Sequence, residues 1–133
     1  MTEQSTSTAL ITNAADYAGP PAVDALLAAD FRVLVQDKTF VDLTAWAQFS
    51  RAHPGAELIA TTDPASLIAT AWNTAGRIDV IVSNDHYPAI HGPSDQALLD
   101  DLRQTLEVLV VEPFAMLKAA IPHLKARAAA MSS

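Results

Sequence analysis

Short apolar runs alternate with amphipathic segments along this chain, and that alternation limits its fold more than any other feature. Four runs have the length and character of buried strands, and they span 8–12, 31–36, 57–60 and 79–83. Segments with helical spacing of apolar residues lie between them. Such an order predicts an α/β fold, in which right-handed crossovers join the strands of a parallel sheet. We expect a doubly wound parallel sheet with the strand order 3-2-1-4.

Capping residues and prolines indicate where two of the helices begin. Pro20 and Pro21 suit the first turn of a helix, because no N–H is needed there. Asp63 followed by Pro64 predicts a second helix start, with Asp63 as the N-cap. Gly76 is the expected C-cap of that helix.

The spacing of apolar side chains predicts two more helices. One spans 41–52, and its inner side carries Leu43, Trp46, Ala47 and Phe49. The other is a long amphipathic helix that begins at Ser94. Pro113 and Pro122 are expected to bend or interrupt it, because proline removes a backbone N–H from the helix.

The composition limits the classes of partner. The chain has 133 residues, which suits a single domain, and half of them are hydrophobic. A net charge of −7 argues against nucleic acid or an anionic membrane as the main partner, since both favour basic surfaces. No cysteine is present, so disulfides and thiol chemistry are excluded. The start of the sequence lacks the features of a secretory signal, and we expect a cytoplasmic protein.

The first strand, turn and helix start, residues 8–23, occupy the place where dinucleotide-binding proteins carry a glycine-rich phosphate loop. Here only Gly19 remains, residues 13–16 fill the turn, and Tyr17 places an aromatic ring where a cofactor would lie. In a sheet of this order the binding site lies above the carboxyl ends of strands 1 and 4. The turn and the loop after Ser83 should therefore meet there. An alternative for Tyr17 is that its ring only packs the turn onto the sheet.

Other polar residues near these strand ends have structural interpretations. Asp37 ends the second strand, where NAD enzymes place the acid that binds the ribose. Without a glycine loop we interpret it as a remnant or a helix-capping group. Residues 83–85 are expected to brace the turn by hydrogen bonds to the backbone. The chain's histidines, His53, His86, His91 and His123, lack a metal-ligand spacing, so we predict no metal site.

Three stretches in register resemble one known family. Thr12-x4-Tyr17-x-Gly19 matches its pattern Thr-x4-Phe/Tyr-x-Gly, and residues 17–26 and 81–85, followed by Tyr87, are also similar to it. The family is that of the halohydrin dehalogenases, cofactor-free relatives of the short-chain dehydrogenases/reductases. The glycine patterns of that larger superfamily, Thr-Gly-x3-Gly-x-Gly and Asn-Asn-Ala-Gly, are missing from this sequence. The similarity covers residues 8–127 and implies a single Rossmann-like domain over residues 1–133, equivalent to the N-terminal half of such an enzyme.

The resemblance implies a reaction whose catalytic residues lie outside this chain. Halohydrin dehalogenases convert vicinal haloalcohols to epoxides and halide, and they open epoxides with small anions. In that family a Tyr, its pKa lowered by an Arg four residues later, takes the proton from the hydroxyl group. A Ser holds the oxygen, and the alkoxide displaces the halide. The only tyrosines here are Tyr17 and Tyr87, followed four positions later by Pro21 and His91. We expect the 133 residues alone to be an inactive part of a lyase.

The resemblance also implies a site and its partners. The expected substrate and halide pocket contains Thr12, Tyr17, Gly19, Ala89 and His91, with no catalytic residue and no cofactor among them. His91 has a second interpretation, as a merely solvated or structural loop residue. The implied partners are a small haloalcohol or epoxide, a halide, and further copies of the chain, since the family forms tetramers. Two alternatives stay open: an NAD(P)-dependent short-chain oxidoreductase with an unusual loop, and a non-catalytic binding domain.

Overall fold

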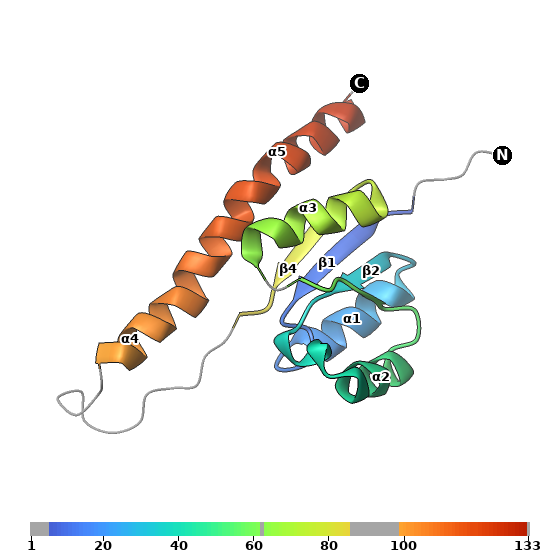
Figure 1. Cartoon of the computed structure of the whole chain (residues 1–133). Coiled ribbons are helices and arrows are strands. Elements are labelled where there is room, and N and C mark those ends of the chain that lie inside the picture. Colours follow the sequence, from blue (N-terminus) through green and yellow to red (C-terminus); the bar gives the residue numbers. More distant parts are fainter. Residues whose placement is uncertain (1–5, 62, 86–98, 133) are drawn as a thin grey trace.

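A four-stranded parallel sheet forms the centre of the computed structural model, which describes residues 6–61, 63–85 and 99–132. The strands are β1 (Thr8–Thr12), β2 (Arg32–Val35), β3 (Glu57–Leu58) and β4 (Val80–Ser83). Their order is β3-β2-β1-β4, so the predicted fold class and strand order are confirmed (Figure 1). β1 has the predicted bounds, whereas the other three strands are shorter than expected.

Helices cover both faces of the sheet (Figure 1). α1 (Gly19–Ala28) and α2 (Leu43–Ala52) pack on one face, and α3 (Pro64–Ala75) and α5 (Glu112–Ser132) pack on the other. The side chains of β1 and β2 alternate between these layers, because successive residues of a strand point to opposite sides. Leu10 and Leu34 belong to the core beside α3 and α5, and Ile11 and Val33 belong to the core beside α1 and α2.

The region before α2 differs from the prediction of a helix that starts at residue 41. Lys38–Val41 forms a 3₁₀ turn capped by Asp37, and Asp42 then caps a new helix through a hydrogen bond from Thr44 N. The helix therefore begins at Leu43, whose side chain is 80% exposed. The prediction that Leu43 lies on the inner side was wrong, because the second cap turns the first helical residue toward solvent.

α3 begins and ends at the predicted residues. The side chain of Asp63 accepts a hydrogen bond from Ser66 N at 2.9 Å, and Pro64 lies in the first turn. Gly76 is the C-cap in the left-handed conformation, with φ of 76°. Capping chemistry thus fixed both ends.

The Asp63 cap gives a prediction about pH. Hydrogen bonds from Ser66 N and Ser66 Oγ lower the pKa of Asp63, because they favour the charged carboxylate. A lowered pKa in the folded state contributes stability above the usual pKa of about 3.9, and that contribution is lost as pH falls through the folded value. Asp63→Asn removes this titration. We expect the melting temperature of the wild type to exceed that of the variant near neutral pH, with the difference shrinking in acid. A difference that stays constant with pH would contradict this explanation.

The last helical segment runs without interruption from Leu99 to Ser132 (Figure 1). It consists of α4 (Leu99–Leu106), a π-helical turn (Glu107–Val111) and α5. Of the two effects expected of Pro113 and Pro122, a bend or an interruption, the interruption does not occur. The wider turn before Pro113 changes the hydrogen-bond spacing where proline cannot donate. Pro122 lies inside α5, which is held by the packing of its inner side against the core.

The predicted start of this long helix, Ser94, lies outside the described residues. Within the described ranges, no helix combines the length and the hydropathy needed to span a bilayer.

Candidate functional site

The turn between β1 and α1 lies next to the end of β4, as the sequence predicted. Asn84, which follows β4 and is 5% exposed, connects the two. Its side-chain Nδ2 donates to the carbonyl oxygens of Asn13 at 2.9 Å and Asp16 at 2.8 Å. Its backbone N–H donates to Thr12 Oγ1 at 3.2 Å. The predicted bracing role is confirmed for Asn84.

The N–H groups at the start of this turn are bound by protein acceptors. Asn13 N donates to Gln36 Oε1 at 3.0 Å, and Ala14 N donates to the Gln36 carbonyl at 2.9 Å. Ala15 N donates to Asp37 Oδ2 at 3.0 Å. In a dinucleotide-binding turn such N–H groups bind the pyrophosphate. Here the acceptors for these N–H groups are side-chain and backbone oxygens from the end of β2 instead of a pyrophosphate.

The sequence predicted a role for Asp37 at the end of β2 but none for its neighbour Gln36. The predicted capping role of Asp37 is confirmed, since its Oδ1 accepts from Thr39 N at 2.9 Å while Oδ2 holds Ala15 N. The role of Gln36 was missed. The only sign of this role in the sequence was a polar residue directly after an apolar strand. In the structure Gln36 is buried, with 4% of its surface exposed. A buried amide needs partners, and the first turn supplies one.

Gly19 allows the helix to begin against the turn. A Cβ at this position would lie 2.1 Å from the carbonyl oxygen of Ala14, well inside contact distance. The backbone N–H of Gly19 also donates to the Asp16 carbonyl at 3.0 Å. Gly19, the one glycine left in residues 8–23, is therefore required because two backbone segments approach each other closely there.

Tyr17 has an unusual backbone conformation. Its φ is 55°, in the left-handed region, which costs a residue with a side chain roughly 1–2 kcal/mol. Its backbone N–H donates to Asp16 Oδ1 at 2.7 Å, and 73% of the residue is exposed. The alternative in which the ring packs the turn onto the sheet does not agree with that exposure. Strained residues held by their surroundings are common at functional sites.

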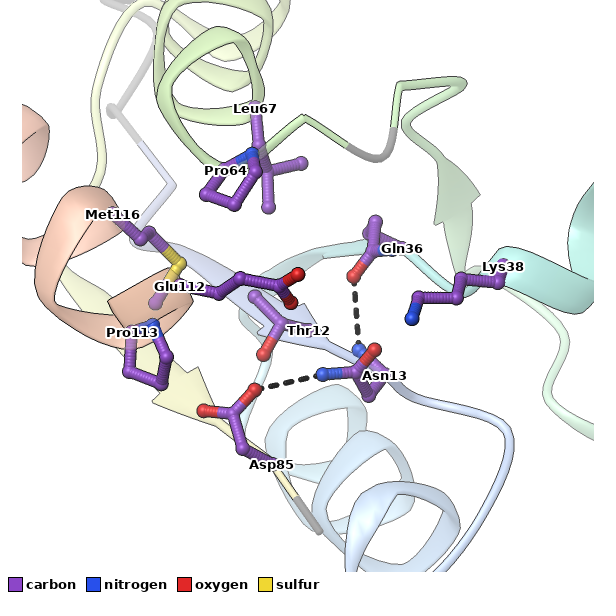
Figure 2. Close-up of a pocket in the computed structure, with 10 residues that line it drawn as sticks. All are labelled: Thr12, Asn13, Gln36, Lys38, Pro64, Leu67, Asp85, Glu112, Pro113 and Met116. Atoms are coloured by element: carbon purple, nitrogen blue, oxygen red, sulfur yellow. Dashed lines mark hydrogen bonds between the residues drawn. The ribbon is translucent and has the colours of Figure 1, made fainter. Parts of the chain in front are cut away.

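A small cavity lies at the carboxyl ends of the strands (Figure 2). Its volume is about 30 Å³, enough for one or two water molecules. Figure 2 shows Asn13 Nδ2 donating to Asp85 Oδ1, at 2.8 Å, on one side of it. Apolar atoms of α3 and α5 form the opposite side, and the polar lining residues are Thr12, Asn13, Gln36, Lys38, Asp85 and Glu112.

Carboxylates outnumber cations around this site. Asp85 and Glu112 line the small cavity, and Asp16 and Asp37 line a second hollow of about 310 Å³ that shares Glu112 with it. Lys38 lines both. This charge balance disfavours phosphate groups, which carry several negative charges, at the end of the sheet.

The residues predicted to form one pocket do not all line the same cavity in the structure. Thr12 lines the small cavity, Gly19 is buried beneath the turn, and Tyr17 is exposed beside it and does not line that cavity. Ala89 and His91 lie outside the described residues. Among residues 6–61, 63–85 and 99–132, no group of three histidine, aspartate or glutamate side chains could hold a metal.

A further titratable pair lies away from this site. His53 Nδ1 is 2.6 Å from Asp24 Oδ1, and its ring packs against Phe49 at a centroid distance of 4.5 Å. The pair joins α1 to the end of α2 and was not predicted. A histidine directly before Pro54 gave no signal for such a long-range partner.

Solved structures are similar to this chain. No protein-family model matches it, and no curated protein matches it significantly. A structure described as a dehalogenation enzyme is 33% identical, with a TM-score of 0.85 over 92% of this chain and 50% of its own. A halohydrin dehalogenase bound to ethyl (2S)-oxiran-2-ylacetate is 29% identical, with a TM-score of 0.84 over 91% of this chain and 48% of its own.

More distant structures share the fold. A short-chain dehydrogenase/reductase from Serratia marcescens is 18% identical, with a TM-score of 0.77 over 89% of this chain and 51% of its own. At that identity the likeness shows the Rossmann-like architecture alone. The chain spans about half the length of all these solved structures.

Proposed function

Because the chain resembles the N-terminal half of a halohydrin dehalogenase in sequence and fold, we propose that it supplies half of a haloalcohol site. The reaction is the cofactor-independent conversion of vicinal haloalcohols to epoxides and halide, with epoxide opening by small anions as its reverse. One observation carries the proposal. The turn that would bind a pyrophosphate has its N–H groups at Asn13, Ala14 and Ala15 bound by protein acceptors.

The charge of the site supports the same substrate class. A haloalcohol or an epoxide is uncharged and meets no repulsion from Asp85 and Glu112, whereas a dinucleotide would bring its pyrophosphate against them. The similar halohydrin dehalogenase was solved with an epoxide, ethyl (2S)-oxiran-2-ylacetate. In the proposal, Thr12, Tyr17 and Gly19 form or support one wall of the pocket, and Ala89 and His91 belong to the same pocket.

The displacement itself requires groups beyond these residues. An alkoxide forms when a base takes the hydroxyl proton, and it then attacks the neighbouring carbon while the carbon–halogen bond breaks. Holding both groups in line supplies much of the rate. In the related enzymes the base is the Tyr described above, assisted by Ser and Arg. We propose that residues 1–133 alone are inactive and contribute scaffold, pocket wall and the exclusion of NAD.

A chimeric enzyme tests this function. Residues 1–133 would replace the matching half of the 33%-identical dehalogenation enzyme in one continuous chain. We expect this chimera to release halide from a small chloro- or bromo-alcohol without added cofactor, and not to bind NADH in a fluorescence titration. A folded chimera that binds NADH and releases no halide would favour the oxidoreductase instead.

Tyr17→Gly in the same chimera separates function from stability. Glycine adopts a φ of 55° without strain, so we expect the free energy of unfolding to stay equal or to rise by about 1 kcal/mol. Halide release should fall at least about tenfold, because the pocket loses its aromatic wall. A loss of stability with unchanged halide release would indicate that Tyr17 is only a packing residue.

A further inference from the structure

Tyr17 has a carboxylate directly beside it. Asp16 is an exposed residue, and its side-chain Oδ1 accepts a hydrogen bond from the backbone N–H of Tyr17 at 2.7 Å. The backbone of Asp16 is held as well, because its carbonyl oxygen accepts hydrogen bonds from Asn84 Nδ2 at 2.8 Å and from Gly19 N at 3.0 Å. A negative charge is therefore fixed next to the residue whose ring is proposed to form one wall of the pocket.

The other charges around the site do not cancel this one. Among the described residues, the charged groups that line the two hollows at the end of the sheet are four carboxylates and one ammonium group, those of Asp16, Asp37, Asp85, Glu112 and Lys38. Figure 2 shows the Glu112 carboxylate pointing into the small cavity from α5. A small anion at this end of the sheet therefore meets a negative local potential.

The start of α1, residues 19–22, offers an anion no free N–H donor in return. Pro20 and Pro21 have no N–H group. The N–H of Gly19 is used within the turn, and Ala22 N donates to the Ala18 carbonyl oxygen at 3.2 Å. Helix N-termini usually attract anions through free N–H groups together with the positive end of the helix dipole. Here the prolines and the internal hydrogen bonds remove the first of these two contributions.

We propose that Asp16 sets the charge selectivity of this site, so that uncharged molecules are admitted and small anions are kept away from Tyr17. Its consequence for the reaction rests on the proposed function: halide release would suffer little inhibition by the halide product, and epoxide opening by anions would be slow. In that reverse step the anion attacks an epoxide carbon, the carbon–oxygen bond breaks, and the alkoxide takes up a proton. Asp16 takes no part in these bond changes. It lowers the local concentration of the anion beside Tyr17.

Nuclear magnetic resonance with charged paramagnetic probes tests the local potential in the protein itself. Two nitroxides of similar size, one carrying an ammonium group and one a carboxylate, are added in turn, and the relaxation of the Tyr17 and Ala18 amide protons is measured. We expect the cationic nitroxide to have the larger effect by at least about threefold, because a nearby negative charge attracts one probe and repels the other.

Two substitutions separate Asp16 from the overall charge of the protein. Asp16→Asn keeps an acceptor for the Tyr17 N–H and removes the charge, so the ratio of the two probe effects at Tyr17 should fall at least about twofold. Asp30→Asn is the matched control, because it makes the same change of net charge at an exposed residue just beyond the other end of α1. The ten residues of α1 span about 15 Å, well beyond the Debye length of about 8 Å at physiological ionic strength. The control should therefore leave the ratio unchanged.

A second readout connects the local potential to the reaction. In the chimera with the 33%-identical dehalogenation enzyme, Asp16→Asn should lower the KM for azide in epoxide opening at least about threefold. The KM for the epoxide should stay the same, since an uncharged molecule does not respond to the lost charge. A purely structural role of Asp16 would change both values.

The outcomes distinguish this inference from the proposed function. A probe ratio near one in the wild type, or a ratio that Asp16→Asn leaves unchanged, overturns the charge selectivity. An equal change with Asp30→Asn also overturns it, because the overall charge would then be the cause. An active chimera in which Asp16→Asn leaves the KM for azide unchanged overturns the role of Asp16 in the reaction. The expected probe ratios together with a chimera that releases no halide support the local potential and count against the dehalogenase function.

Discussion

Gly19→Ala is expected to lower the free energy of unfolding by roughly 3 kcal/mol, near the upper end of the range for overpacking. The added Cβ would lie 2.1 Å from the carbonyl oxygen of Ala14 and 2.6 Å from its carbonyl carbon. Because the obstacle is backbone, no side-chain rotation can relieve the contact. The turn would have to separate from the start of α1, and Tyr17, which lies between them, would move with it.

Gly76→Ala is the control for this substitution. Gly76 has a φ of 76°, but a Cβ there meets nothing within 4 Å. Only the left-handed conformation is then penalised, at about 1 kcal/mol. Urea unfolding of both variants gives the comparison. Equal losses would mean that the close approach at Gly19 has no energetic cost of its own.

Asn84→Ala is expected to cost about 2 kcal/mol, because it removes a buried donor from two carbonyl oxygens. The side chain of Asn84 connects the end of β4 to Asn13 and Asp16 across the site. Without it the first turn loses two of its hydrogen bonds to the end of β4. Hydrogen exchange at the amides of Tyr17 and Gly19 should become faster.

Two variants sharpen this test. Asn84→Asp keeps the shape but sets a carboxylate against the same two carbonyl oxygens, so we expect a larger loss than with alanine at neutral pH. Ser83→Ala changes an exposed neighbour and should stay within about 0.5 kcal/mol of the wild type. If Asn84→Ala also stays within that limit, the amide does not brace the turn.

The sheet and the helix ends of this protein could be predicted because their signals are local. β1 is a continuous apolar run and has the predicted bounds. Asp63, Pro64 and Gly76 fix α3 through capping chemistry that involves neighbouring residues only. The strand order then follows from general rules for parallel sheets.

The errors arose where two local signals compete or where packing decides. Residues 37–43 contain two acceptable caps, Asp37 and Asp42, and the structure uses both, so that α2 begins at Leu43. Pro122 is a helix breaker by its own chemistry. The burial of Met116 and Ala120 on the same helix holds α5 together across it.

The location of the candidate site could be predicted, but its internal contacts could not. The position above β1 and β4 follows from topology alone. The hydrogen bonds that close the turn join Asn13 to Gln36 and to Asn84, across 23 and 71 residues. Such pairs carry no sequence pattern, since each side chain has many possible partners. Only the geometry selects among them.

The two helical layers each contain one of the chain's two tryptophans. Trp46 packs edge-on against Phe40 on the α1 and α2 side, with ring centroids 5.2 Å apart. Trp72 stacks on His123 of α5 at 4.3 Å on the other side. The protein therefore has a separate fluorescent reporter for each layer. Replacing one tryptophan at a time would show whether the layers unfold together or whether α5 detaches while α1 and α2 remain in place.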